Sequence, residues 1–212
     1  MLLDTNIKTL FSITHDLLED FSTTCHSVDW ARDEMTRTGD PLISRTIRIP
    51  FGYRKDPYQE LTEQVVQVQQ AFFNGIYPWL QNKFPNFVFY KGEINYLYPG
   101  MILPFHVDAC WFHEHGSRIH IPVISNDEAV WITETDSGSM SVGTVYEVNN
   151  RVLHSFWNKG TTGRLHIVID LIQKDVYQSA IDNGIDMNKF TVDPQLTDAA
   201  IILKNLGVAQ SG

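Results

Sequence analysis

The 212 residues, 43% of them hydrophobic and 12% aromatic, are enough to bury the core of one globular domain. A formal net charge of −9 argues against nucleic acid as a partner, because phosphate binding needs clustered Lys and Arg. Asp4 and Lys8 interrupt the apolar run that a signal peptide would need, and no window reaches the roughly 20 apolar residues of a membrane helix, so we expect no membrane partner and a cytoplasmic location.

Residues 1–85 are expected to form helical support with one or two strands. Apolar side chains recur at helical spacing over residues 6–21, which predicts a first helix. Alternation over residues 44–50 predicts a strand. A second helix is expected to begin at Asp56-Pro57, where an N-cap type precedes a proline, and to end near Pro78.

Residues 86–173 change to short β-like runs separated by Gly, Pro, Asn and Asp. About eight runs at this spacing are typical of an all-β sandwich or barrel: NFVFY, EINYLY, ILPFHV, SRIHIPVI, AVWITE, MSVGTVYEV, VLHSFW and RLHIVIDLI. Residues 174–212 return to helix, with helices expected at 175–181 and 193–206. We therefore predict a single domain over 1–212, mainly β, with a jelly-roll (double-stranded β-helix) core packed against N-terminal helices.

His106-Val107-Asp108 is the most informative motif. In an extended segment, residues i and i+2 share one face, so the imidazole and the carboxylate would point the same way. A third ligand must come from elsewhere, and His154, 48 residues later on a predicted strand, is a suitable candidate. Two histidines and one carboxylate on one face of a metal leave the opposite positions open, as in non-haem Fe(II) oxygenases.

Arg164 follows His154 by ten residues and lies in the otherwise apolar run RLHIVID. A guanidinium can hold a carboxylate through two parallel hydrogen bonds, which a lysine cannot match. An unpaired buried charge is costly, so an anionic ligand would explain this position well. A structural pair with an internal carboxylate such as Asp170 is the rival explanation.

Together these residues resemble the aspartyl/asparaginyl β-hydroxylase-like branch of the 2-oxoglutarate/Fe(II) dioxygenases, which includes bacterial free L-proline cis-4-hydroxylase. The resemblance covers about a third of the chain, in these segments: Tyr96 to Gly100, His106 to Asp108, Arg118 to His120, His154, Arg164 to His166, and Asp170. Mammalian aspartyl/asparaginyl β-hydroxylases lack an acidic residue at the Asp108 position, whereas the free-proline hydroxylases have one, so the substrate cannot be copied from the mammalian enzymes.

The resemblance implies a set of roles. His106, Asp108 and His154 would bind Fe(II), and Arg164 would bind the distal carboxylate of the cosubstrate 2-oxoglutarate. Arg118 and His120 would help to bind the cosubstrate near the metal, and Asn95 falls where some relatives use a serine at the distal carboxylate. The implied reaction uses dioxygen to hydroxylate an amino acid side chain, free or within a peptide or protein.

Two other classes of function stay open: a cupin-like metalloenzyme that works without 2-oxoglutarate, and a non-catalytic binding or sensor protein on the same scaffold. His113 and His115 form an H-x-H pair like that of cupin metal sites, but the glutamate expected after it is missing. Cys25 and Cys110 have no CxxC spacing, which indicates two reduced thiols rather than a zinc site or a disulfide framework.

Several neighbouring residues have competing interpretations. His113 and His115 are expected to be solvated loop residues that iron binding does not need. Trp111 and Phe112 could wall a substrate pocket or merely cover the core. His166 should face the same side as Arg164, because side chains alternate along a strand, and it is expected to be a core histidine more often than a ligand.

Overall fold

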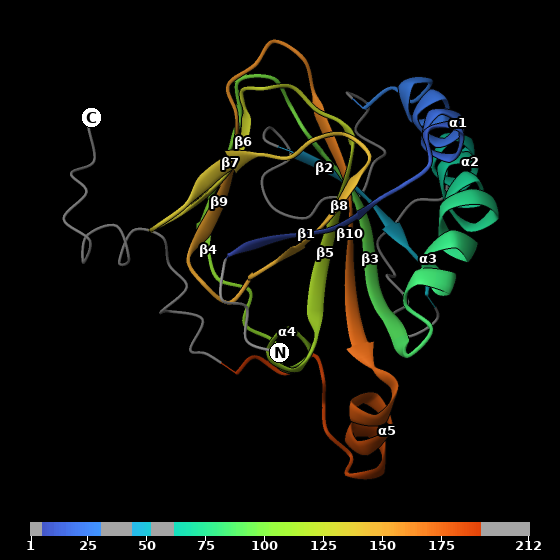
Figure 1. The fold of residues 1–212 in the computed structure, drawn as a ribbon, viewed down its shortest axis with the longest axis vertical. Coiled ribbons are helices and arrows are strands. Elements are labelled where there is room, and N and C mark those ends of the chain that lie inside the picture. Colours follow the sequence, from blue (N-terminus) through green and yellow to red (C-terminus); the bar gives the residue numbers. More distant parts are fainter. Residues whose placement is uncertain (1–5, 31–43, 52–61, 192–212) are drawn as a thin grey trace.

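The computed structural model describes residues 6–30, 44–51 and 62–191. Two antiparallel sheets face each other as a double-stranded β-helix, and helices cover the outer face of the larger sheet (Figure 1). The predicted fold class, mainly β with a jelly-roll core packed against N-terminal helices, is thus confirmed. Among the described helices, none is long and apolar enough to cross a membrane.

The larger sheet has six strands in the order β1-β8-β5-β10-β3-β2, and the smaller has four in the order β4-β9-β6-β7. The bounds of the larger sheet's strands are β1 Ile7–Ser12, β2 Ser44–Ile49, β3 Phe87–Leu97, β5 Ser117–Ile124, β8 Thr144–Val148 and β10 Arg164–Gln173. Those of the smaller sheet are β4 Ile102–His106, β6 Ala129–Thr133, β7 Ser137–Ser139 and β9 His154–Asn158.

Three helical segments pack on the outer face of the larger sheet: α1 (His15–His26), α2 (Glu63–Ala71) and α3 (Tyr77–Lys83) (Figure 1). The side chain of Thr62 accepts a hydrogen bond from the Val65 N–H and so caps the start of α2. Several strands of the sheet contribute to this core, and alternate residues of β10 add Leu165, Ile167, Ile169 and Leu171. The large apolar core therefore lies outside the two sheets, between the larger sheet and the helices.

The other residues of β10 point between the two sheets, because side chains alternate along a strand. They are Arg164, His166, Val168 and Asp170. At one end of this space a second apolar cluster fills the gap, built around Trp131, Tyr146 and Phe156. The polar residues of β10 face the remaining space, and this is where the candidate site lies.

The helix predicted over residues 6–21 is wrong in its first half. Residues 7–12 form β1, which pairs with β8 at the edge of the larger sheet, and α1 begins only at His15. Ile7, Leu10 and Phe11 are compatible with either periodicity, and pairing with a strand more than 130 residues away decides between them.

The second predicted helix also needs correction. Its expected start at 56–57 lies outside the described residues, and it does not end near Pro78, because α3 continues to Lys83. A π-helical turn, η1 (Phe72–Ile76), lies just before the proline, and the Tyr77 N–H donates to the carbonyl of Phe72 across it. This wider turn accommodates a residue that has no N–H of its own to donate.

The β prediction is right in outline, including the strand at 44–50. The first two predicted runs, however, are one continuous strand, β3, with Gly92 in its middle. A Cβ atom on Gly92 would lie 2.3 Å from the Phe51 ring, so the glycine serves close packing and does not mark a turn. β7 and the short helix α4 (Trp111–His115) were not predicted.

The tail is only partly described. The helix predicted at 175–181 is confirmed as α5 (Lys174–Asp182), and the one predicted at 193–206 lies outside the described residues.

Candidate active site

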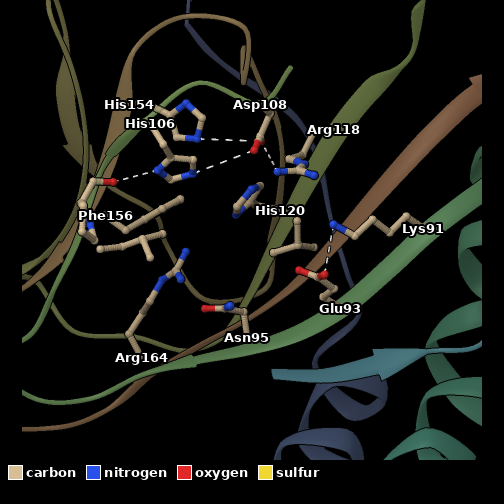
Figure 2. Close-up of a pocket in the computed structure, with 13 residues that line it drawn as sticks. Lys91, Glu93, Asn95, His106, Asp108, Arg118, His120, His154, Phe156 and Arg164 are labelled. Carbon is tan, nitrogen blue, oxygen red and sulfur yellow. Dashed lines mark hydrogen bonds and ion pairs between the residues drawn. The ribbon is translucent and has the colours of Figure 1, made fainter. Parts of the chain in front are cut away.

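His106, Asp108 and His154 come together between the two sheets. His106 ends β4 and His154 begins β9, and the antiparallel register places them opposite each other. The Nε2 atoms of His106 and His154 lie 4.0 Å and 3.9 Å from the two carboxylate oxygens of Asp108 (Figure 2). One ligand atom from each residue fits within a group no more than 4.8 Å across. A donor set of two nitrogens and one oxygen could hold a single divalent metal ion.

Both histidines have their tautomer fixed in the same way. The Nδ1 atom of His106 lies 2.8 Å from the carbonyl oxygen of Pro104, and that of His154 lies 2.9 Å from the carbonyl oxygen of Val152. A carbonyl only accepts, so Nδ1 carries the proton and Nε2 presents its lone pair to the site. Burial, with His106 as the next cause, lowers the pKa of His154 to about 4 and keeps the ring neutral.

Arg118 holds Asp108 from the other side. Its guanidinium pairs with Asp108 through Nη1, and it also donates to both carboxylate oxygens of Asp170 at 2.8 and 2.9 Å. The Asn150 amide adds a hydrogen bond of 3.3 Å to Asp108. Burial alone would raise the pKa of Asp108, but Arg118 together with His154, His113 and His106 outweighs it and holds this pKa well below its usual range. Asp108 is therefore ionised and oriented before any metal arrives.

His113 belongs to the same network, and its prediction as a solvated loop residue is wrong. It lies on α4 with 7% of its surface exposed, and its Nε2 is 3.0 Å from Arg118 Nη2. Burial first, and then Arg118, lower its pKa to about 4. His115 is exposed, as predicted, and stacks on Trp111 with ring centroids 4.1 Å apart. Neither histidine is among the three grouped donors.

Arg164 is buried at 3% exposure, and within the described part of the chain no carboxylate lies within ion-pair distance of it. Its Nη2 donates to His166 Nδ1 at 2.6 Å, and its guanidinium lies 3.9 Å from the centre of the Phe156 ring. Burial lowers the pKa of Arg164 to about 9. The rival pair with Asp170 is wrong, because Asp170 pairs with Arg118.

A cavity of about 360 Å³ connects these groups (Figure 2). Its polar lining includes all seven residues predicted for the site: Asn95, His106, Asp108, Arg118, His120, His154 and Arg164. His120 is buried, and its Nδ1 has no hydrogen-bond partner among the described residues. Asn95 donates to Thr46 Oγ1 at 3.0 Å.

Two charged lining residues were not predicted, Lys91 and Glu93. The signal was present, because Lys91, Glu93 and Asn95 alternate on β3 and share one face, but splitting β3 at Gly92 hid it. Trp111 and Phe112 do not line this cavity. Phe112 packs instead in a separate core cluster with Tyr90.

A sequence model of the family described as aspartyl/asparaginyl beta-hydroxylase matches residues 62–174, just over half of the chain. HygX from Streptomyces hygroscopicus, solved with nickel, 2-oxoglutarate and hygromycin B bound, aligns with a TM-score of 0.52 at 9% identity, covering 80% of this chain and 84% of HygX. AviO1 from Streptomyces viridochromogenes Tue57 aligns with a TM-score of 0.50 at 13% identity, covering 81% of this chain and 91% of AviO1.

At such identities these two structures show a shared fold alone, and no curated protein matches. The family assignment depends on the sequence model, and the grouped donors agree with it. The chain therefore belongs to the aspartyl/asparaginyl β-hydroxylase family and is a hydroxylase of the 2-oxoglutarate-dependent dioxygenase type.

Proposed function

We propose that this chain hydroxylates an amino acid side chain, with Fe(II) held by His106, Asp108 and His154 and the distal carboxylate of 2-oxoglutarate held by Arg164. One observation carries the proposal: the same cavity is lined by a three-donor group and by a buried arginine that has no carboxylate partner among the residues the structure describes. The first needs a cation and the second needs an anion.

The donor set fits iron. Two neutral imidazoles and one carboxylate suit Fe(II), and three protein ligands leave positions for other ligands. When bound, Fe(II) would supply the oxidative chemistry with dioxygen. The residues around it orient the donors: the carbonyl groups of Pro104 and Val152 fix the two imidazoles, and Arg118 fixes the carboxylate.

Several features of the cavity support the cosubstrate site. His166 accepts one N–H of Arg164, which fixes the guanidinium plane and leaves its other N–H groups for a carboxylate. The buried Nδ1 of His120 needs a partner that a ligand could provide. Asn95 and Arg118 complete the polar lining. On the same fold, HygX holds a metal and 2-oxoglutarate together.

The two other classes explain less. A cupin-like enzyme without 2-oxoglutarate would leave Arg164 buried at a cost with nothing to pair with. A binding or sensor protein would have no use for a metal site with open positions. We therefore retain the hydroxylase, acting on an amino acid that is free or within a peptide.

Oxygen uptake measured together with succinate release separates the three. The protein is loaded anaerobically with Fe(II), given 2-oxoglutarate and air, and assayed with free amino acids and short peptides. We expect oxygen uptake and succinate release in equal amounts, both requiring Fe(II) and 2-oxoglutarate. Oxygen uptake without 2-oxoglutarate would favour the cupin-like enzyme. Binding of Fe(II) and 2-oxoglutarate without succinate release would favour the sensor.

Variants at the donors assign the metal site. His106→Ala and His154→Ala should reduce succinate release to background, whereas Asp108→Gly should keep some, because relatives without this carboxylate exist. His115→Ala is the matched control, since it removes an exposed histidine a few residues away. Full activity in His154→Ala would contradict the assignment.

A further inference from the structure

Two charged residues of β3 face the cavity and have no part in the roles above. Lys91 and Glu93 share the inward face of the strand with Asn95, and Gly92 and Ile94 face the helices. Their side chains are 21% and 14% exposed. Figure 2 shows them on the opposite side of the view from Arg164, with Asn95 between and the three grouped donors above.

The Glu93 carboxylate lies within ion-pair distance of two cationic side chains. Its Oε1 lies 3.1 Å from Lys91 Nζ and 3.6 Å from Arg48 Nη1 on the neighbouring strand β2. Burial alone would raise the pKa of Glu93, but Lys91, Arg48 and Arg118 together outweigh it and keep this pKa below its usual value. Oε1 nevertheless accepts no well-aligned hydrogen bond. The carboxylate is therefore ionised and retains capacity to accept an N–H.

The sheet register separates this pair from the predicted cosubstrate end. Arg164 lies opposite Leu97, whereas Val168 lies opposite Glu93 and Asp170 lies opposite Lys91. Four to six residues along a strand span roughly 13–20 Å, so a 2-oxoglutarate carboxylate on Arg164 cannot also contact this pair. Asp170 in turn lies opposite Arg118, which holds Asp108. The pair is therefore on the part of the cavity that the cosubstrate leaves open.

On the basis of the proposed function, we propose that Lys91 and Glu93 bind the head group of the substrate, and that the substrate is a free α-amino acid. Its ammonium group would bind Glu93 and its carboxylate would bind Lys91, so a ligand with both charges replaces one ion pair with two. A residue inside a peptide carries neither charge and would offer neither member of this partly buried pair a charged partner.

The size of the cavity agrees with a small substrate. At about 360 Å³ it lies near the lower end of ligand pockets, which run from roughly 300 to 1,000 Å³. The volume must hold the cosubstrate as well, which leaves room for a molecule of amino acid size. A peptide would need a longer groove.

The test uses the intact Fe(II)-loaded protein with 2-oxoglutarate and air. The probes are the twenty proteinogenic L-amino acids, each supplied free and as its N-acetyl amide, and the readout is the rate of succinate release. At least one free amino acid should stimulate release, and its capped form should not. Glu93→Gln and Lys91→Gln should raise the KM for that amino acid on the order of tenfold or more, since each loses a charge-assisted contact.

Two control variants have the same chemistry away from the cavity. Glu147→Gln changes a carboxylate that accepts a hydrogen bond from Ser117 at 2.7 Å, and Lys159→Gln changes an exposed lysine over the Trp157 ring. Both should keep the wild-type KM for the amino acid. Thermal unfolding and 2-oxoglutarate titration of the Mn(II)-loaded variants separate a lost substrate contact from a damaged fold or cosubstrate site.

The possible outcomes are distinct. If no free amino acid stimulates succinate release, if capped forms stimulate equally, or if both β3 variants keep the wild-type KM, the inference is wrong. If the wild-type protein binds no 2-oxoglutarate when loaded with Mn(II), the proposed function itself is wrong, and this failure is visible before any amino acid is added.

Discussion

Two arginines with little exposed surface line one cavity in opposite electrostatic situations. Arg118 lies between Asp108 and Asp170, contacts both, and has its pKa raised by them. Arg164 has no carboxylate in ion-pair distance within the described part of the chain, and burial lowers its pKa to about 9. One cation is neutralised by the protein itself, and the other is left to be neutralised by a ligand.

The different surroundings of Arg118 and Arg164 predict that one arginine contributes mainly to stability and the other mainly to ligand binding. A buried ion whose partners are all protein groups costs much when one partner is removed, because the others stay buried without compensation. A buried ion without a protein partner destabilises the ligand-free fold and stabilises the complex. The Arg118 region should therefore respond to mutation in stability, and the Arg164 region in affinity.

The largest expected effect is at Arg118. Arg118→Gln leaves the partly buried Asp108 and the buried Asp170 without their cation, so the free energy of unfolding should fall by about 3–5 kcal/mol. Urea unfolding of the metal-free protein measures it. Arg151→Gln is the control, since this arginine donates to the backbone carbonyl of Glu114 and should change stability little. A loss below 1 kcal/mol in Arg118→Gln would show that Arg118 does not stabilise the fold more than Arg164 does.

His113 predicts a pH dependence in the same network. Its pKa falls from 6.5 to about 4 on folding, so below pH 6.5 the unfolded chain takes up a proton that the folded chain refuses. Stability is therefore full above pH 6.5 and is lost as the pH falls toward 4, by up to about 3 kcal/mol. His113→Asn should lose less stability than wild type between pH 7 and pH 4.5 in urea unfolding. If wild type and His113→Asn lose the same amount of stability over this pH range, His113 is not buried as a neutral ring.

For Arg164, the informative quantity is whether its replacement lowers or raises the free energy of unfolding of the ligand-free protein. Arg164→Met removes an unpaired buried charge, so the ligand-free protein should stay within about 1 kcal/mol of wild type or become more stable. Thermal unfolding without ligands measures this, and adding 2-oxoglutarate with Mn(II) should stabilise wild type but not the variant. A loss of 3 kcal/mol or more would make Arg164 a structural residue like Arg118.

The smallest effect is expected at His115. This side chain is exposed, so His115→Ala should change stability by no more than about 0.5 kcal/mol and leave one metal ion bound per chain. Metal content after gel filtration checks it. Loss of the metal from the folded variant would mean that the H-x-H pair, and not the predicted triad, holds it.

Patterns within single strands were enough to predict the main features of the site. The i, i+2 spacing of His106 and Asp108 predicted a shared face, and alternation predicted that His166 faces the same side as Arg164; the structure brings both pairs together. The jelly-roll core was predictable because its strands are short and separated by turn residues.

What failed depends on distant contacts. Residues 7–12 became a strand through pairing with β8, and His113 is buried because α4 places it against Arg118 and Asp170. Gly92 was taken as a break in β3, although its role is close packing under Phe51. Lys91 and Glu93 were missed for the same reason. The distant contacts of residues 7–12, His113 and Gly92 leave no periodic signal in the sequence, whereas the alternation of Lys91, Glu93 and Asn95 was visible but was split at Gly92.

We propose that Arg164, which has no carboxylate within ion-pair distance in the described ranges 6–30, 44–51 and 62–191, binds the distal carboxylate of 2-oxoglutarate. Isothermal titration of 2-oxoglutarate into the Mn(II)-loaded protein tests it most directly, with Arg164→Lys beside wild type. Lysine keeps the charge but loses the two parallel hydrogen bonds, so we predict one site per chain and a Kd on the order of tenfold higher in the variant, with Mn(II) binding unchanged. Equal affinity of the two proteins for 2-oxoglutarate would contradict the claim.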